Sequence, residues 1–390
     1  MTKTLYAALA LVATAGAAAA ECGGPFPDFL FGIQREAAAR GLPEDATSAF
    51  LSGARQDPAV LRADRAQGVF QMRFTDFARR LISSNRRQNG AAQAAQWAET
   101  FDRIDSEHGV PRGVLLAFWG LETDFGAVQG DFNTRDALLT LAHDCRRPEL
   151  FRPQVFAAIE LTAHGDMDPA TTTGAWAGEI GMVQMLPEDI LTYGTDADGD
   201  GHVRLKTSPR DALTSGAKML RGLGWQPNQP WLQEVRVPID LNWAEAGLHA
   251  QKPVAEWAAL GVAPTAGTLP DPGLQASLLL PEGRNGPAFL AYPNFRVFFE
   301  WNQSFVYVTT AAYFATRLEG APVFNPGTPS PPLSQDQMKA LQQALADRGH
   351  DVGGIDGILG QKTRAAVRAE QARLGHPPDA WPTVALLSAL

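Results

Sequence analysis

The sequence is poor in cysteine, has no excess of basic residues, and has no long apolar run after its first twenty residues. Its 2 cysteines and 7 histidines are scattered over 390 residues, which excludes a zinc motif of closely spaced ligands. The formal net charge of −9 argues against a nucleic-acid partner, because no basic excess is available to neutralise phosphates. No later apolar run is long enough to cross a bilayer, so we expect no transmembrane segment.

The composition is that of an ordinary globular protein, with 45% hydrophobic and 19% charged residues, and the length suffices for two domains. The first twenty residues have the features of a secretion signal. Lys3 gives a positive start, residues 5–15 are apolar, and residues 18–20 form a small-residue cleavage site. We therefore predict a signal peptide over residues 1–20 and an exported, periplasmic protein that begins at Glu21.

The two cysteines are Cys22 and Cys145. An even number of cysteines in an exported chain favours a disulfide between them. Closing so long a loop stabilises a fold by roughly 3–5 kcal/mol in the chain-entropy model. A lipid anchor on Cys22 is not expected, because Glu21 stands where lipid attachment would need a small residue.

The pattern along residues 26–225 predicts a mainly α domain. Alanine-rich amphipathic stretches separated by Gly and Pro breaks predict helices at Phe29–Arg40, Ala91–His108 and Arg135–His143. Further on, two strand-like runs flank a Glu-Gly-Arg-Asn-Gly turn and predict a hairpin of Gln275–Leu280 with Ala288–Tyr292. Another helix is predicted at Phe305–Leu318. The fold class is therefore mainly α (α+β), with a small β hairpin region.

Residues 322–332 are rich in proline and lack apolar periodicity, which predicts a semi-extended linker that tethers two domains. The first domain then covers residues 21–321. Residues 333–390 form a compact module with two predicted helices, whose apolar stripes are Met338, Leu341 and Leu345, and Thr363, Val367, Gln371 and Leu374. A glycine-rich loop separates them.

Glu122 is the candidate catalytic residue. Segment 111–126 reads as a buried helix, with Pro111 in the first turn and Gly126 as the stop. At helical spacing one face carries Leu115, Phe118, Glu122 and Phe125, so a carboxyl group interrupts an apolar stripe. Burial and the negative end of the helix dipole both disfavour its ionised form. A carboxyl held protonated in this way can act as a general acid, although the segment alone is equally compatible with a solvated Glu at a helix end.

Three ordered blocks resemble one known family. They are Phe118-Trp-Gly-Leu-Glu122-Thr-Asp-Phe-Gly126, then Gly174-Ala-Trp-Ala-Gly-Glu-Ile-Gly-Met-Val-Gln184-Met-Leu-Pro187, then Pro293-Asn-Phe-Arg-Val-Phe-Phe-Glu-Trp301-Asn302-Gln-Ser304. The chain resembles the lytic murein transglycosylase B family, glycoside hydrolase family 103, from about residue 22 to 320. The tail, through Asp351-Val-Gly-Gly-Ile-Asp356-Gly and the following Thr363, resembles a peptidoglycan-binding domain of the three-helix type.

The resemblance implies a lysozyme-like domain that cleaves the β-1,4 bond between MurNAc and GlcNAc. Glu122 would first act as acid and then as base for the C6 hydroxyl of the muramic sugar, which leaves 1,6-anhydroMurNAc. Two other hypotheses stay open, a muramidase-type hydrolase that uses a second carboxylate and a non-catalytic peptidoglycan-binding scaffold. The implied partners are glycan strands and stem peptides, no cofactor is required for the chemistry, and a monomer is expected.

The same motifs supply substrate-binding candidates. By resemblance Gln184 and Tyr193 line the sugar subsites, while Trp301, Asn302 and Ser304 offer an aromatic face and hydrogen-bonding groups. For Tyr193 and Trp301, core packing is the alternative. Carboxylates of the stem peptide are the expected partners of Arg146 and Arg147, which are otherwise solvated. Glu179 is the best candidate for a hydrolytic partner, with a structural or substrate-contact role preferred, and Asp124 is expected to stabilise the turn near Gly126.

The segment from Asp196 to Gly201 has carboxylates at positions 1, 3 and 5 and glycine at 6, as in a calcium loop. Position 12 is Thr207, where a bidentate Glu is expected. By resemblance Asp211 supplies the missing oxygens. The predicted structural calcium site consists of Asp196, Asp198, Asp200, the backbone carbonyl of His202, and Asp211. A metal-free turn is the alternative.

Overall fold

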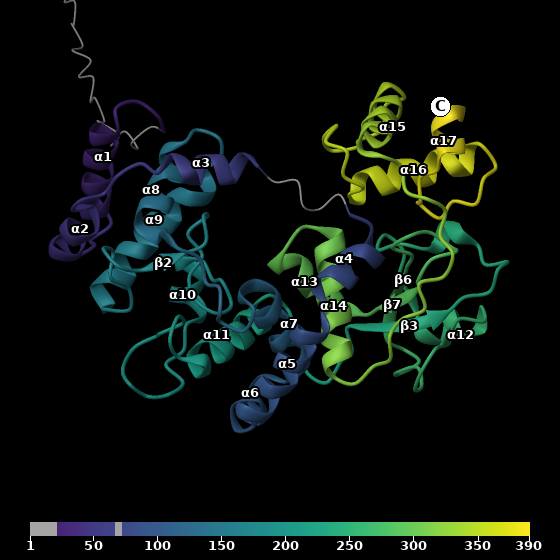
Figure 1. Cartoon of the computed structure of the whole chain (residues 1–390), viewed down its shortest axis with the longest axis horizontal. Helices are drawn as coiled ribbons and strands as arrows, with labels where there is room; N and C mark the ends of the chain where they lie inside the picture. The colour runs from purple at the N-terminus through teal and green to yellow at the C-terminus, as the bar shows by residue number, and fades with distance from the viewer. Residues whose placement is uncertain (1–21, 67–71) are drawn as a thin grey trace, which may run out of the picture.

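The computed structural model of the chain describes residues 22–66 and 72–390 (Figure 1). The predicted signal peptide lies outside these residues. The described part has three hydrophobic cores: a large helical one, a second around a small sheet, and a third in the C-terminal domain. Among the described helices none is long and apolar enough to cross a membrane.

The large core is built almost entirely from helices. They are α1 (Phe26–Ala39), α2 (Glu44–Leu51), α3 (Pro58–Arg65), α4 (Phe74–Leu81), α5 (Ser84–Gln96), α6 (Ala98–His108), α7 (Arg112–Thr123), α8 (Thr134–His143), α9 (Pro148–His164), α10 (Pro187–Tyr193), α11 (Pro209–Gly222), α13 (Pro293–Trp301) and α14 (Phe305–Leu318). A short antiparallel pair, β1 (Phe132–Asn133) and β2 (Thr173–Gly174), joins them. The helix predicted at Ala91–His108 is in fact two helices, because the backbone leaves the α conformation at Trp97.

Helix α7 carries Glu122 through the middle of this core. Pro111 is its N-cap residue, and every residue from Gly113 to Gly120 is buried. It ends earlier than the predicted Gly126, because Asp124 and Phe125 both adopt a left-handed backbone with φ of 50° and 60°. This reversal folds the Phe125 ring back onto Trp119, with ring centroids 5.7 Å apart. Glu122 therefore stands in the last helical turn, directly before the chain turns away.

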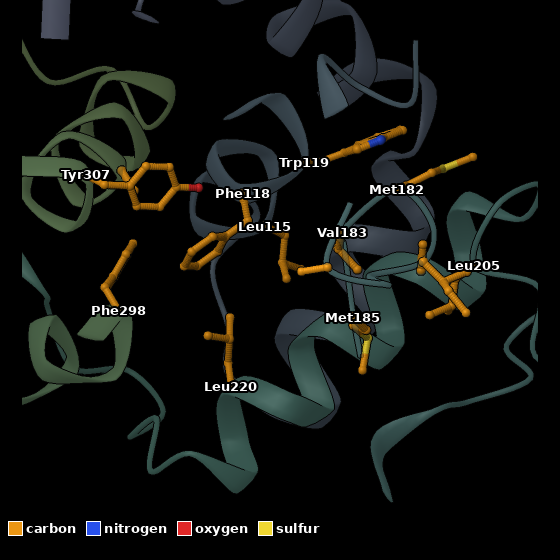
Figure 2. Close-up of a cluster of buried hydrophobic side chains, with 14 of the residues drawn as sticks. Leu115, Phe118, Trp119, Met182, Val183, Met185, Leu205, Leu220, Phe298 and Tyr307 are labelled. Carbon is orange, nitrogen blue, oxygen red and sulfur yellow. The ribbon is translucent and has the colours of Figure 1, made fainter. Parts of the chain in front are cut away.

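Helix α14 packs closely along α7. A Cβ atom added at Gly113 would lie 2.7 Å from the carbonyl oxygen of Ala315, so only glycine permits this approach. The two helices meet side chains from α11, α13 and the segment around Val183, whose apolar groups fill the space below α7 (Figure 2). This packing fixes the distance between the end of α7 and the beginning of α14, where the site lies.

The second core lies under a five-stranded antiparallel sheet of order β4-β6-β7-β3-β5. The strands are β3 (Leu232–Arg236), β4 (Lys252–Pro253), β5 (Ala263–Pro264), β6 (Gln275–Leu279) and β7 (Phe289–Ala291), with α12 (Val254–Ala259) and a 3-10 turn at Trp243–Glu245 beside them. The predicted hairpin is β6 with β7, and Leu278 pairs with Leu290. The other three strands were not predicted, and two of them, β4 and β5, have only two residues each.

The C-terminal domain has three helices, α15 (Gln335–Asp347), α16 (Gln361–Arg373) and α17 (Val384–Ala389), around a small core. A capping box formed by Ser334 and Gln337 begins α15. In Figure 1 these helices sit beside the β6–β7 end of the first domain.

The linker predicted as a tether is fixed to the first domain. Phe324 is buried against Phe74 and Tyr313, and the backbone N–H of Thr328 donates to the carbonyl of Asn285 at 2.8 Å. Trp381 of the C-terminal domain donates to the carbonyl of Ser330 at 3.0 Å. Proline content indicated an extended chain, but it could not reveal these contacts.

The predicted disulfide is confirmed. Cys22 and Cys145 are bonded, with their Cα atoms 5.2 Å apart and 123 positions apart in the sequence. Next to it, His143 Nε2 donates a hydrogen bond to the carbonyl of Gly24 at 3.0 Å, and its ring meets Phe26 and Phe29 edge-on. These contacts hold the beginning of α1 against α8.

Candidate active site

A cleft of about 1050 Å³ opens between the first domain and the C-terminal domain. One wall comes from α4 and the end of α3, and another from the segment that joins α13 to α14. The C-terminal domain closes one side with residues 357–361 and Arg364. The residues that line this cleft include Trp176, Glu179, Trp301, Asn302, Ser304, Phe305, Tyr307 and Arg364.

Glu122 lies against two of these lining residues. The Tyr307 hydroxyl donates a hydrogen bond to Glu122 Oε1, and Trp301 Nε1 donates to the same oxygen at 3.2 Å. Figure 2 shows Tyr307 extending from α14 toward α7. Both donors bond Oε1, and within the described residues no hydrogen bond engages Oε2. One carboxyl oxygen is therefore held in place while the other is available.

The surroundings of Glu122 favour its protonated form. Burial, the largest effect, raises the pKa of this carboxyl from 4.5 to about 7. The hydrogen bonds from Tyr307 and Trp301 act in the opposite direction, and the nearby charge of Glu179 raises the pKa further. Burial and the adjacent carboxyl also raise the pKa of Tyr307 well above its usual value, so its hydroxyl stays a donor. A carboxyl with such a pKa can both give and take a proton near neutral pH.

Glu179 is a second carboxyl in the same cleft. Its backbone is fixed by a hydrogen bond from the Ala175 N–H to its carbonyl at 3.0 Å, and a Cβ atom at Gly174 would lie 2.0 Å from that oxygen. Glycine at 174 is thus required for the turn that presents Glu179. Burial is the largest influence on its carboxyl and raises the pKa, and Oε2 is buried without a hydrogen-bond partner.

Three predicted substrate residues of the third block also line the cleft. Trp301 stacks on Phe118 with ring centroids 4.2 Å apart, so this lining residue also holds Glu122. Asn302 Oδ1 accepts from the Ser304 N–H at 2.9 Å, and Ser304 caps α14. Asn302 and Ser304, which were predicted to hydrogen-bond the sugar, therefore use part of their hydrogen-bonding groups to cap the N-terminus of α14.

The other predicted substrate residues are not among the lining residues of this cleft. Gln184 has a left-handed backbone (φ 55°) and donates to the carbonyl of Gly181 at 2.7 Å. Tyr193 packs against Gly222 of α11. Arg146 and Arg147 both form ion pairs with the buried carboxylate of Asp64. Contact of these four residues with substrate stays a prediction, and the two arginines would have to leave Asp64 to bind a stem peptide.

Asp124 stabilises the turn after α7, in the role that the sequence favoured. Its carboxylate forms an ion pair with Arg86 Nε at 3.1 Å, and Arg86 also donates to the carbonyl of Leu81 at 2.6 Å. The side chain is two positions from Glu122 and does not share its hydrogen bonds.

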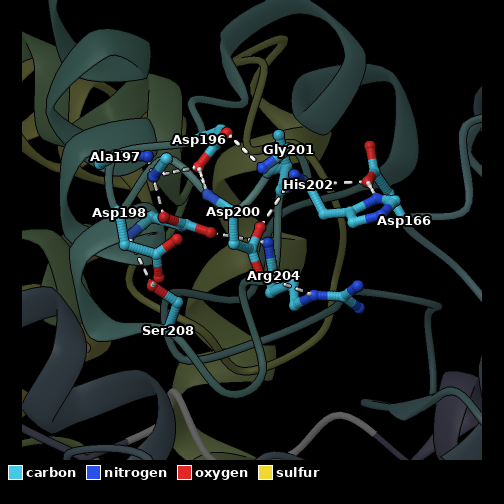
Figure 3. Close-up of polar contacts among 12 residues, drawn as sticks. Asp166, Asp196, Ala197, Asp198, Asp200, Gly201, His202, Arg204 and Ser208 are labelled. Carbon is cyan, nitrogen blue, oxygen red and sulfur yellow. Dashed lines mark hydrogen bonds and ion pairs between the residues drawn. The ribbon is translucent and has the colours of Figure 1, made fainter.

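The acidic loop brings three of its predicted ligands together. Oxygen atoms of Asp196, Asp198 and Asp211 lie within 4.8 Å of one another (Figure 3). Asp211 points into the loop, where it accepts from the backbone N–H groups of Ala197 and Arg204, each at 2.9 Å. The backbone N–H of Gly201, with those of Gly199 and Asp200, lowers the pKa of Asp196. Three oxygen donors around one point fit a hard cation such as Ca²⁺.

Two further residues of that loop have other partners. Asp200 pairs with Arg204 at 3.2 Å, so its carboxylate is not gathered with the other three. The His202 imidazole contacts Asp166 through Nδ1 at 3.0 Å, and a contact of its backbone carbonyl with a cation stays a prediction. The site therefore has fewer side-chain ligands than the sequence pattern suggested.

Two parts of the chain match models of known protein families. Residues 25–316 match the family model described as a transglycosylase SLT domain, which is more than half of the chain. The chain belongs to this transglycosylase family. Residues 334–390 match a peptidoglycan binding domain model, which fits the resemblance seen in the tail.

Relatives in this transglycosylase family share both sequence and structure with the chain. The membrane-bound lytic murein transglycosylase B of Escherichia coli is 28% identical over 234 residues, which are 58% of this chain and 62% of that protein. The chain thus matches less than two thirds of that relative's length. SltB3 of Pseudomonas aeruginosa, solved in complex with NAG-anhNAM-pentapeptide, is 37% identical with a TM-score of 0.86 and covers 94% of this chain and 99% of its own.

A third relative shares the fold at lower identity. The Escherichia coli lytic transglycosylase Slt35, solved in complex with calcium, is 25% identical with a TM-score of 0.64, over 77% of this chain and 96% of its own. Together with SltB3, this likeness confirms the mainly helical, lysozyme-like transglycosylase fold that the sequence predicted.

Sequence reasoning missed Tyr307. The third block was followed only to Ser304, and Tyr307 lies one helical turn later, inside a run of apolar residues that reads as core. Its one usable signal was position, because a residue in the first turn of a helix capped by Ser304 must lie near that cap.

Proposed function

We propose that the protein is a lytic transglycosylase that cleaves the β-1,4 bond between MurNAc and GlcNAc in peptidoglycan and leaves 1,6-anhydroMurNAc ends. The observation that carries this proposal is the position of Glu122 beside the cleft, with Oε1 held by Tyr307 and Trp301 and a pKa of about 7. Membership of the transglycosylase family and the anhydro-sugar complex of SltB3 support the same activity.

Glu122 would perform both proton transfers. In the first, its protonated carboxyl donates to the glycosidic oxygen as the bond from that oxygen to C1 breaks. In the second, the ionised carboxylate accepts the proton of the C6 hydroxyl as that oxygen bonds to C1. The proton returns to Glu122, no water is consumed, and the product carries a 1,6-anhydro ring. A pKa near 7 suits both directions of transfer at neutral pH.

Glu179 favours this reaction over hydrolysis. A hydrolase that uses a second carboxylate needs that group ionised, to activate water or to attack the sugar. Burial raises the pKa of Glu179, which works against the ionised form. A non-catalytic scaffold is disfavoured because it would have no use for a partly buried acid that accepts two hydrogen bonds on one oxygen.

The test is a set of three matched substitutions assayed on purified sacculi. Glu122→Gln should lose at least ~10²-fold in rate, the usual scale for a missing general acid. Asp124→Asn, two positions along the chain, is the control and should retain most of the activity. Glu179→Gln should lose less than Glu122→Gln. A Glu179→Gln loss as large as that of Glu122→Gln would favour the hydrolase, and an active Glu122→Gln would remove this residue from the chemistry.

We further propose a structural calcium ion held by Asp196, Asp198, Asp211 and the His202 carbonyl, with no part in bond cleavage. The gathered carboxylates and the calcium complex of Slt35 support it. The proposed partners are glycan strands and stem peptides, and the proposed setting is the periplasm, where the disulfide would form. We also propose that the protein acts as a monomer.

A further inference from the structure

The C-terminal domain is docked on the first domain through the turn between β6 and β7. The backbone N–H of Arg284 donates to Asp379 at 3.1 Å, and a Cβ atom at Gly283 would lie 2.6 Å from Trp381 Cβ. At another point Arg368 contacts His249 at 3.1 Å. With the linker also fixed, these contacts hold the two domains in one arrangement.

Arg364 makes a buried contact of this interface. Its side chain comes from α16, and the residue is only 9% exposed. Nη2 donates to the carbonyl of Pro281 at 2.7 Å, and the guanidinium lies 4.5 Å from the centroid of the Phe305 ring. Burial lowers the pKa of Arg364 to about 10, and within the described residues no carboxylate forms an ion pair with it. The Trp381 ring also lies 6.0 Å from the guanidinium, and the charges of Glu282 and Asp379 partly offset the effect of burial. Phe305 is therefore the nearest ring to a buried charge that these neighbours keep in place.

Phe305 links Arg364 to the catalytic acid. It is the first residue of α14, directly after the Ser304 cap, and Tyr307 follows two positions later. A shift of Phe305 therefore shifts the first turn of α14, and with it the hydroxyl that donates to Glu122 Oε1. The Arg364 side chain thus lies at one end of a short connected path that ends at the reacting carboxyl.

We propose that Arg364 is a positioning residue of the active site: the C-terminal domain, through the contact of Arg364 with Phe305, holds the first turn of α14 so that Tyr307 aligns Glu122. The docked domain then affects turnover itself, besides any affinity for the cell wall. This inference rests on the proposed role of Glu122.

The test measures kcat and KM of the full-length protein on a soluble fragment of two GlcNAc–MurNAc repeats, so that wall binding does not contribute. Arg364→Met should lower kcat roughly tenfold with KM within about twofold of wild type, because a small displacement of a catalytic group is costly. Arg364→Lys, which keeps the charge over the ring, should recover part of the loss. Arg368→Met removes a contact of the same interface that does not touch α14, and should change neither constant.

A cycle with Tyr307→Phe separates this role from a structural one. If Arg364 acts through the Tyr307 hydroxyl, Arg364→Met should cost nothing more in the Tyr307→Phe background. Additive losses, or equal losses from Arg368→Met, would overturn the proposal, as would a KM increase with unchanged kcat, which indicates direct substrate contact. Should Arg364→Met unfold, Phe305→Leu provides the same cycle from the other side of the contact.

Glu122→Gln, assayed on the same fragment, distinguishes a failure of the proposed function from a failure of the positioning role of Arg364. If it retains turnover, the proposed function fails. If it is inactive while Arg364→Met matches wild type, only the positioning role fails.

Discussion

Replacing Glu122 by Gln should make the protein more stable, and by an amount that grows with pH. The folded state holds this carboxyl at a pKa of about 7, while the unfolded chain returns it to 4.5. Between these values the folded state binds the additional proton, so the stability that Glu122 contributes is present below pH 4.5 and is lost as pH rises toward 7. Gln has no proton to lose and keeps an oxygen that can accept from Tyr307 and Trp301.

The magnitude follows from the same shift. At about 1.4 kcal/mol per pKa unit, a change from 4.5 to about 7 corresponds to roughly 3.5 kcal/mol. Because Glu122 is partly exposed, solvent screening makes this an upper value. The advantage of Glu122→Gln over wild type should therefore be near zero at pH 4 and approach ~2–3 kcal/mol by pH 8.

The assay is urea unfolding followed by tryptophan fluorescence at several pH values, for wild type, Glu122→Gln and Asp124→Asn. Asp124→Asn controls for the loss of one carboxyl at the same end of α7 and should not show this pH-dependent gain. An equal offset between Glu122→Gln and wild type at pH 4 and pH 8 would refute the raised pKa, and with it the electrostatic account of the acid.

Other consequences can be checked independently. The kcat/KM of wild type should decline above an apparent pKa of about 7, tenfold per pH unit, and a flat profile to pH 9 would mean that another group donates the proton. Reducing the Cys22–Cys145 disulfide should lower the free energy of unfolding by roughly 3–5 kcal/mol, which the double variant Cys22→Ser, Cys145→Ser should reproduce. Calcium at 100 times its Kd should stabilise wild type by about 2.7 kcal/mol and Asp198→Asn much less, whereas identical melting of wild type in calcium and in chelator would show that no ion binds.

Most helices and the candidate acid Glu122 could be predicted from the sequence because the patterns that indicate them are local. The apolar periodicity around Glu122 and the hairpin turn each lie within one short segment of the sequence. The disulfide was predicted from the even number of cysteines in an exported chain. Helix ends were less accessible. The left-handed backbone at Asp124 and Phe125 depends on the Phe125 ring packing against Trp119, which no local pattern reports.

The rest of the site depends on contacts between distant segments. Tyr307 meets Glu122 across 185 positions, and Trp301 does so across 179. The pairing of Arg146 and Arg147 with Asp64 and the docking of Arg364 on Phe305 likewise join segments that sequence patterns treat separately. Two-residue strands such as β4 exist only because neighbouring strands offer their backbone groups, so propensity could not indicate them.

The group that bonds to the muramic C1, either the C6 hydroxyl or water, can be identified directly from the mass of the products. Sacculi digested in ¹⁸O-labelled water should release muropeptides that are one water lighter than reducing sugars and carry no ¹⁸O at the muramic C1. Wild type and Glu179→Gln should both give this result, because the C6 hydroxyl and Glu122 suffice. Reducing muramic ends that contain ¹⁸O would show that water attacks C1, and would contradict the single-acid mechanism.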